Sequence, residues 1–132
     1  MLDQYDLEIR VRYQETDGQG HVHHANYFTY FEQGRTELLR AAGYAYRQLE
    51  AEGIMLVVAE ITCRYLQPAY YDDLLRIRTR TLWARGARIE HEYRVFRGEE
   101  LLAEGRSTVA CINRAGRATR LPKYLQLDRN DG

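Results

Sequence analysis

The sequence contains very little cysteine, proline and lysine, and it has no long apolar run. Its two cysteines, Cys63 and Cys111, form no closely spaced pair, which argues against a disulfide framework and a thiolate metal site. The longest apolar stretch, residues 54–59, is much shorter than the roughly 20 residues that cross a bilayer. The first residues are acidic and lack the basic and apolar regions of a signal peptide. We therefore expect a cytoplasmic protein that does not enter a membrane and whose two free thiols are buried as small apolar groups.

Charge of either sign is not in excess. Nineteen basic and nineteen acidic side chains give a formal net charge of zero, which argues against a general nucleic-acid-binding protein. All the basic residues except Lys123 are arginines, which suit bidentate contacts with phosphate groups. The 132 residues contain no internal repeat or linker, so we expect one domain that spans residues 1–132.

The first half of the chain predicts a strand, a loop and a long helix. Apolar and polar residues alternate from position 5 to 13, as in a half-buried strand, and the polar segment 15–25 predicts a loop. From Asn26 the apolar residues recur at the spacing of a helix of about 17 residues, which Gly43 would end. Asn26 or a residue just before it is expected to cap this helix. Gly34 in mid-helix costs about 1 kcal/mol relative to alanine, so we expect a close approach to a sheet there.

The second half predicts a short helix followed by strands. We expect the helix at residues 44–52 and the strands at 54–66, 74–82, 88–97 and 101–113, with turns at 83–87 and 98–99. Short turns between the last three strands predict an antiparallel meander. The arginines of strand 74–82 and the glutamates of strand 88–97 are expected to form a solvated outer face, and they could pair across the sheet. Residues 126–132 are expected to be frayed.

This order of elements predicts an α+β domain with one long helix against the concave face of a five-stranded antiparallel sheet. Such a sheet leaves two strand edges open. Pairing through an edge strand in a homodimer would cover one of them.

The predicted loop before the long helix is the one dense cluster of reactive side chains in the sequence. Residues 15–26 hold two carboxylates, three imidazoles and two glycines, and they end at the start of a helix, where backbone N–H groups can polarise a carbonyl or bind an anion. Residue types alone leave two equal alternatives for Asp17, a reactive carboxylate or the cap of a turn. The spacing of His21, His23 and His24 fits neither a helical metal-binding pair nor a Cys/His arrangement, so we expect no metal site.

The loop also carries a family resemblance. The segments 11–27 and 31–37, with Tyr65, Pro68 and Asp73 further along, resemble the hotdog-fold acyl-CoA thioesterases. The match is to the 4-hydroxybenzoyl-CoA thioesterase family, and especially to its branch of short-chain acyl-CoA thioesterases associated with the Tol–Pal system. It covers roughly residues 7 to 125. The resemblance implies a hotdog fold, in which a curved five-stranded antiparallel sheet wraps a long central helix, assembled as a homodimer or homotetramer with the active site between protomers.

The resemblance also implies roles for individual residues. Asp17 matches the family's catalytic carboxylate, as nucleophile or general base, and His24 is the second catalytic residue that the resemblance implies. The backbone N–H groups near His24 match the element that polarises the thioester carbonyl. The His24 imidazole either orients water or substrate and helps proton transfer, or only its main chain takes part. The substrate-binding residues would be Gly20, Val22, His23, Tyr27 and Glu60, although Tyr27 could equally belong to the core and Glu60 could point outward. Arg85 and Arg88 are the candidates for contacts with the CoA phosphates. No cofactor is implied. The alternatives are a thioesterase for acyl carrier protein and a hotdog module that binds acyl-CoA without cleaving it.

Overall fold

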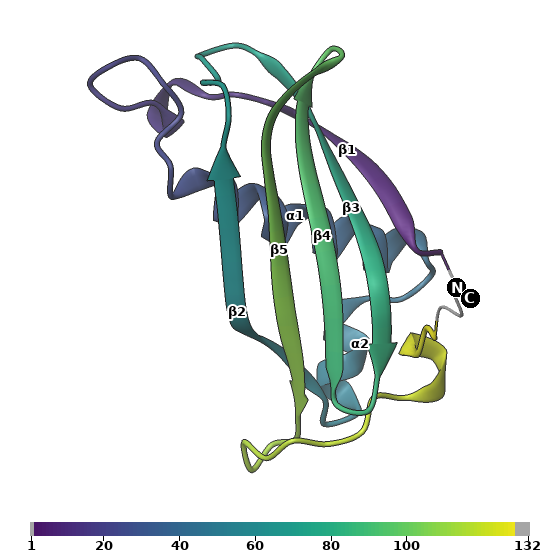
Figure 1. Cartoon of the computed structure of the whole chain (residues 1–132). Helices are drawn as coiled ribbons and strands as arrows, with labels where there is room; N and C mark the ends of the chain where they lie inside the picture. Colours follow the sequence, from purple (N-terminus) through teal and green to yellow (C-terminus); the bar gives the residue numbers. More distant parts are fainter. Residues whose placement is uncertain (1, 129–132) are drawn as a thin grey trace.

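The computed structural model describes residues 2–128 and places one long helix behind a curved five-stranded antiparallel sheet (Figure 1). The elements in chain order are β1 (Gln4–Arg10), η1 (Tyr13–Glu15), α1 (Asn26–Ala41), α2 (Tyr46–Ala51), β2 (Met55–Tyr65), β3 (Leu74–Arg85), β4 (Arg88–Arg97), β5 (Glu100–Ile112) and η2 (Lys123–Leu125). The strands lie in the order β1-β3-β4-β5-β2, so that β1 and β2 form the two edges. This arrangement is the predicted α+β hotdog architecture, including the antiparallel meander of β3, β4 and β5.

Strand β3 is longer than the sequence pattern predicted. The expected turn at 83–87 shrinks to Gly86 and Ala87, because β3 continues to Arg85. The register of β3 on β4 shifts between Thr81 and Trp83, and this irregularity interrupts the alternation on which the prediction relied. Gly86 has a φ of +62°, which a two-residue connection of this kind requires.

Helix α1 is held close to the sheet at Gly34, as its position in mid-helix predicted. A Cβ at this residue would overlap with the Oγ1 atom of Thr79 on β3 and would lie 3.4 Å from a methyl carbon of Ile77. Gly43 follows the helix with a φ of +98°, which agrees with the predicted stop. The N-cap residue is Ala25, just before Asn26, and it forms no side-chain capping bond. Asn26 is the first helical residue, and its side chain donates to the Glu15 carbonyl oxygen at 2.8 Å.

The core has two apolar clusters along the length of α1. One lies under the N-terminal half of the helix and includes Tyr30, Phe31, Ile77 and Val95. The other lies towards the far end of the sheet, where α2 and the C-terminal segment pack, and includes Leu49, Ile89, Cys111, Leu121 and Leu125.

The C-terminal segment is ordered for longer than predicted. Leu127 pairs with Ala84 through two backbone hydrogen bonds of 2.7 and 2.8 Å, which ties residues 126–128 to β3. The rest of the predicted frayed segment, residues 129–132, lies outside the described part of the chain.

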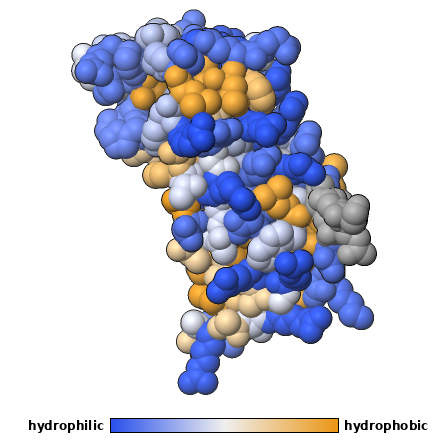
Figure 2. Space-filling model, viewed as in Figure 1, coloured by the Kyte–Doolittle hydropathy of each residue, from blue (hydrophilic) through white to orange (hydrophobic). Residues whose placement is uncertain are grey.

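The outer face of the sheet carries many hydrophilic residues, together with a compact apolar patch near its upper end (Figure 2). Its ion pairs differ from the expected pairing of β3 with β4. Arg76 and Arg78 of β3 contact Asp6 on the edge strand β1, and Glu90 of β4 instead contacts Arg106 on β5. Register explains the partner of Arg78, which lies directly opposite Arg94 on β4 but opposite Asp6 on β1.

Both cysteines are free thiols. Cys111 is fully buried, as expected, whereas Cys63 on the edge strand β2 is only partly buried. Burial raises the pKa of the Cys63 thiol to about 11, so it is protonated at neutral pH. Among residues 2–128, no helix has both the length and the apolar character needed to cross a bilayer.

Candidate active site

The segment that contains Asp17 is a small hairpin rather than an open loop. Thr16 and Val22 form an antiparallel bridge, and inside it the Asp17 amide donates to the His21 carbonyl at 2.7 Å. The Gly20 amide closes the turn by donating to the Asp17 carbonyl at 3.0 Å, and Gly20 adopts a φ of +81° that favours glycine. Asp17 therefore has a fixed position at the start of a tight turn.

The Asp17 carboxylate is held by main-chain donors on one oxygen only. Oδ1 accepts the Gln19 amide at 2.8 Å and the His21 amide at 3.2 Å. The Gln19 hydrogen bond, helped by the His21 amide and the neighbouring His21 and His23 imidazoles, holds the pKa of Asp17 below its ordinary value of 3.8 against a smaller effect of desolvation. The structure shows no partner for Oδ2 within residues 2–128. Asp17 thus caps the turn with one oxygen and presents the other as an ionised, unpaired acceptor.

A free backbone donor lies between this hairpin and α1. The amides on either side are used, since His23 donates to the Glu15 carbonyl at 2.8 Å and Ala25 donates to the His23 Nδ1 atom at 3.2 Å. The structure gives the His24 amide no acceptor within the described chain. The hydroxyl of Tyr65, at the end of β2, donates to the His24 carbonyl at 2.9 Å and so fixes the peptide that follows His24. The His24 amide itself lies one residue before Ala25, the N-cap of α1, at the end of the helix where the dipole favours negative charge.

The three imidazoles do not converge on a point. The rings of His23 and His24 are exposed and stack with their centroids 4.2 Å apart, while His21 packs edge-on against Tyr70. The structure shows no contact between the His24 imidazole and the Asp17 carboxylate in residues 2–128. Within the same residues, no group of three His, Cys, Asp or Glu side chains could hold a metal ion.

Behind the hairpin lies Glu15, a buried carboxylate that sequence reasoning assigned only to the loop. Its Oε1 atom accepts the Arg12 amide at 2.8 Å and the Tyr30 hydroxyl at 3.0 Å, and its Oε2 atom faces the Arg12 guanidinium. The Glu15 carbonyl accepts from both the His23 amide and the Asn26 side chain. Glu15 therefore joins the hairpin to α1.

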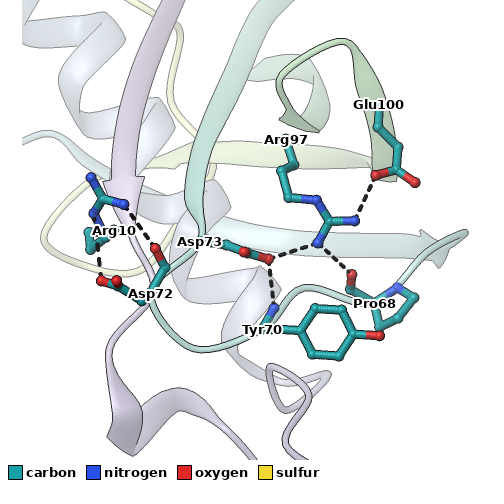
Figure 3. A network of polar contacts seen from close by, with 7 residues as sticks. All are labelled: Arg10, Pro68, Tyr70, Asp72, Asp73, Arg97 and Glu100. Atoms are coloured by element: carbon teal, nitrogen blue, oxygen red, sulfur yellow. Dashed lines mark hydrogen bonds and ion pairs between the residues drawn. The ribbon is translucent and has the colours of Figure 1, made fainter.

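A second segment, residues 66–73, also contacts the hairpin, and a polar network holds this segment in place (Figure 3). Asp73 accepts the Tyr70 amide at 2.9 Å and the Arg97 guanidinium at 2.7 Å, and Arg97 also donates to the Pro68 carbonyl. The Ala69 carbonyl then accepts the Val22 amide at 2.8 Å. Pro68 and Asp73, which belonged to the sequence motif, thus act on the position of the hairpin rather than through contact with Asp17.

The other residues that were predicted to bind substrate do not lie together beside Asp17. Val22 and Tyr27 are core residues, and Tyr27 packs edge-on against Tyr30 and Tyr65. Glu60 is exposed on the free edge strand β2, just after a register shift, so this chain alone does not build a pocket around it.

Arg85 and Arg88 lie opposite one another at the β3–β4 turn, at the end of the sheet away from the Asp17 hairpin (Figure 1). Strand β3 starts beside the hairpin and runs for roughly 36 Å to Arg85. Neither arginine can therefore reach Asp17 within one protomer. Arg85 instead contacts Asp128 at 3.5 Å and covers the ring of Trp83.

Comparison with known proteins identifies the family of this chain. Residues 11–127 match the family model described as the thioesterase-like superfamily. The chain is 37% identical over 106 residues to the acyl-CoA thioester hydrolase YbgC of Escherichia coli O6:H1, which covers 80% of this chain and 79% of that protein. It is 36% identical over 115 residues to the acyl-CoA thioesterase YbgC of Haemophilus influenzae, which covers 86% and 85% of the two chains.

A solved structure shows the same fold. The DHNA-CoA thioesterase of Staphylococcus aureus superposes with a TM-score of 0.87 at 28% identity, covering 92% of this chain and 83% of that one. The family match extends over both the Asp17 hairpin and the 66–73 segment that supports it. The chain is therefore a hotdog-fold member of the thioesterase-like superfamily, the family to which the motif around Asp17 pointed.

Proposed function

We propose that this protein hydrolyses acyl-CoA thioesters to the free acid and CoA, with Asp17 as the reacting carboxylate. The observation that carries the proposal is the arrangement of the hairpin, which offers an unpaired Asp17 oxygen and, seven residues later, an unpaired His24 amide at the N-terminus of α1. The relatives named acyl-CoA thioesterases support the substrate class.

The chemistry needs few groups. A CoA thiolate is a good leaving group, so the reaction requires an ionised carboxylate and a donor to the developing oxyanion rather than a strong general acid. The lowered pKa of Asp17 keeps it ionised at neutral pH. The carboxylate either attacks the thioester carbonyl to give a mixed anhydride that water then cleaves, or removes a proton from the attacking water. In both routes the His24 amide stabilises the oxyanion, and no cofactor takes part.

We further propose that the working unit is a homodimer, or a tetramer built from it, paired through the free edge of β2. Val57, Val58 and Glu60 are exposed along this strand, and an open apolar edge is a liability in a monomer. A two-fold axis that pairs β2 with its own copy runs the two strands antiparallel. The β3–β4 turn and the Asp17 hairpin lie at opposite ends of one protomer (Figure 1). In this dimer the β3–β4 turn of one protomer would approach the hairpin of the other and bring Arg85 and Arg88 to the CoA phosphates.

The proposed reaction fits a cytoplasmic location, where reducing conditions keep Cys63 and Cys111 as the free thiols seen in the structure.

Substitution of Asp17 tests the central role. Asp17→Asn and Asp17→Ala are expected to lower kcat/KM in a thioester panel with free-thiol detection by about 10²–10⁴-fold, with unchanged size-exclusion behaviour. Asp17→Asn keeps an oxygen that accepts the Gln19 and His21 amides and should also keep the wild-type melting temperature. Glu99→Gln, at the exposed β4–β5 turn, is the matched control and should retain activity. Near-wild-type hydrolysis in both Asp17 variants would overturn the assignment. Wild-type protein that binds acyl-CoA and leaves it intact would instead establish a binding module.

The carrier of the acyl group needs a separate comparison. Wild-type enzyme should cleave acyl-CoA with a lower KM than the matching acyl-pantetheine, which lacks the nucleotide phosphates. Arg85→Gln combined with Arg88→Gln should remove this difference and leave acyl-pantetheine hydrolysis unchanged. Preference for acyl carrier protein over both small donors would contradict the choice of CoA.

A further inference from the structure

The start of helix α1 lacks the side-chain cap that usually holds this part of a helix. Ala25 occupies the N-cap position and forms no capping bond. The first bonds along the helix are long, at 3.3 Å from the Tyr27 amide to the His24 carbonyl and from the Phe28 amide to the Ala25 carbonyl. The first turn of α1 therefore holds the backbone of His24, which carries the proposed donor to the oxyanion, only weakly.

A side chain from the sheet compensates for the missing cap. Tyr65 is the last residue of β2, and its hydroxyl donates to the His24 carbonyl at 2.9 Å, which is shorter than the bond from the Tyr27 amide to the same oxygen. An ordinary N-cap side chain accepts from the free amides at the start of a helix and uses up those donors. Tyr65 instead holds the carbonyl of His24, so it fixes the residue and leaves the His24 amide free.

Tyr65 is itself held in place on the sheet. Its ring packs edge-on against the core residue Tyr27, with the ring centroids 5.1 Å apart. The two backbone amides that follow Tyr65 both donate to the Leu102 carbonyl on β5, at 2.8 and 3.0 Å. Partial burial, with a smaller effect of the nearby Cys63, raises the pKa of Tyr65 to about 12, so the hydroxyl remains a donor at neutral pH.

The peptide groups on the two sides of His24 are each anchored by one hydrogen bond. On the N-terminal side, the His23 carbonyl accepts the Asn26 amide at 2.9 Å, and this bond polarises the peptide group that bears the His24 N–H. On the C-terminal side, the hydroxyl of Tyr65 holds the His24 carbonyl, and its ring lies edge-on to the His24 imidazole. Loss of the Tyr65 hydroxyl removes one of the two anchors, so the direction of the His24 N–H is no longer fixed relative to the sheet.

We propose that Tyr65 is a positioning residue for the oxyanion donor, whose hydroxyl holds the His24 backbone so that its free amide points to the place where the thioester oxygen gains negative charge. This inference rests on the proposed hydrolysis and extends it to a residue outside the Asp17 hairpin. Tyr65 acts through His24 and does not contact the reacting atoms. A misplacement of about 1 Å in such a group can cost about 10²-fold in rate.

Steady-state kinetics of Tyr65→Phe test this role, because the change removes the hydroxyl and keeps the ring. We expect kcat for acyl-CoA hydrolysis to fall about 10- to 100-fold, with KM changed by less than about twofold. Tyr124→Phe is the matched control, since it also loses one tyrosine hydrogen bond, of 2.7 Å to Glu52, in the second core cluster. This control should keep wild-type kcat. A normal kcat in Tyr65→Phe, or an equal loss in both variants, would overturn the inference.

Two acyl-CoA analogues separate positioning from a merely structural effect. A trifluoromethyl ketone forms a tetrahedral hydrate that resembles the developing oxyanion, whereas a thioether analogue lacks the carbonyl oxygen. In Tyr65→Phe the affinity for the ketone should fall by the same factor as kcat/KM, about 10- to 100-fold, and the affinity for the thioether should stay unchanged. Equal weakening of both analogues would show that Tyr65 shapes the binding surface as a whole, which contradicts a positioning role.

Backbone NMR reads the position of the His24 amide without substrate. In Tyr65→Phe its signal should shift and its heteronuclear NOE should fall, while the Gln19 and His21 amides that bind Asp17 keep their wild-type signals. An unchanged His24 signal would reject the inference.

The inference and the proposed function fail in different ways. Near-wild-type hydrolysis in Asp17→Asn, or no hydrolysis by the wild type, would reject the proposed function and with it the role of Tyr65. Loss of hydrolysis in Asp17→Asn together with a normal kcat in Tyr65→Phe would reject only the role of Tyr65.

Discussion

The Tyr30 hydroxyl donates a hydrogen bond of 3.0 Å to the Glu15 carboxylate, and both side chains are buried. This contact joins the N-terminal half of α1 to the base of the Asp17 hairpin across fifteen residues of sequence. Burial and the adjacent Glu15 charge raise the pKa of Tyr30, so the phenol remains protonated and a donor at neutral pH. The geometry of the proposed active site therefore depends on a buried polar pair that does not itself contact substrate.

Loss of the hydrogen bond between Tyr30 and Glu15 should affect both stability and activity. We expect Tyr30→Phe to lower the free energy of unfolding by about 1–2 kcal/mol, because one buried oxygen of Glu15 loses a donor. Activity should fall through kcat, since the hairpin loosens while the Asp17 carboxylate remains. Urea denaturation and steady-state kinetics measure the two effects. Tyr13→Phe, where the ring is 77% exposed, is the matched control. Equal stability of the two variants would show that the Glu15 hydrogen bond contributes nothing.

The contact of α1 with the sheet gives a second prediction. Gly34→Ala should lower the free energy of unfolding by about 1–3 kcal/mol, because the overlap of the new methyl group with Thr79 outweighs the gain in helix propensity. Thr79→Ala removes the overlapping hydroxyl, so the double variant should be more stable than the sum of the two single changes predicts. Chemical denaturation of all four proteins completes the cycle. Gly18→Ala, where a Cβ meets nothing within 4 Å, is the control. Simple additivity would contradict the close approach.

The segment opposite the hairpin gives a third prediction. In Asp73→Asn the side chain keeps its size but loses the charge that binds Arg97, and we expect a loss of about 1 kcal/mol for this partly exposed pair. The Tyr70 and Val22 amides should then exchange with deuterium faster, because Asp73 holds the first directly and the second through the Ala69 carbonyl. Asp72→Asn is the control, since the Asp72 side chain is 70% exposed. Unchanged exchange at Val22 would show that the segment does not hold the hairpin.

The features that the sequence predicted are those with local signals. The spacing of apolar residues from Asn26 and the stop at Gly43 specify α1, and a glycine in mid-helix has few explanations other than close packing. The motif around Asp17 is contiguous, so the hairpin could be recognised before its geometry was known. The turn after β3 was misplaced because a register shift hides the alternation that marks a strand.

The features that the sequence did not predict depend on distant partners. Tyr65 reaches the His24 carbonyl across 41 residues, and nothing in the composition of β2 marks its hydroxyl for that contact. Arg97 and Asp73 are similarly separated, by 24 residues. The alternation of burial along β4 puts His91 and Tyr93 on the same face of the sheet. The alternation could not reveal that Arg35 of α1 lines the same cavity as His91, because the position of Arg35 depends on how α1 crosses the sheet.

Buried His91 gives the last prediction, on the pH dependence of stability. Burial, with the nearby Arg35 charge, lowers the pKa of His91 from 6.5 to about 3, so the folded protein keeps this imidazole neutral while the unfolded chain takes up a proton below pH 6.5. The neutral His91 therefore makes its full contribution to the free energy of unfolding above pH 6.5, and this contribution is lost as the pH falls towards 3. Between pH 7 and pH 5 the loss should be about 2 kcal/mol. In His91→Phe that part of the decrease should disappear, whereas His23→Gln, at an exposed ring, should behave like wild type. Urea denaturation at the two pH values gives the difference. A decrease of the same size in His91→Phe would show that other groups cause it and that His91 accepts a proton in the folded state.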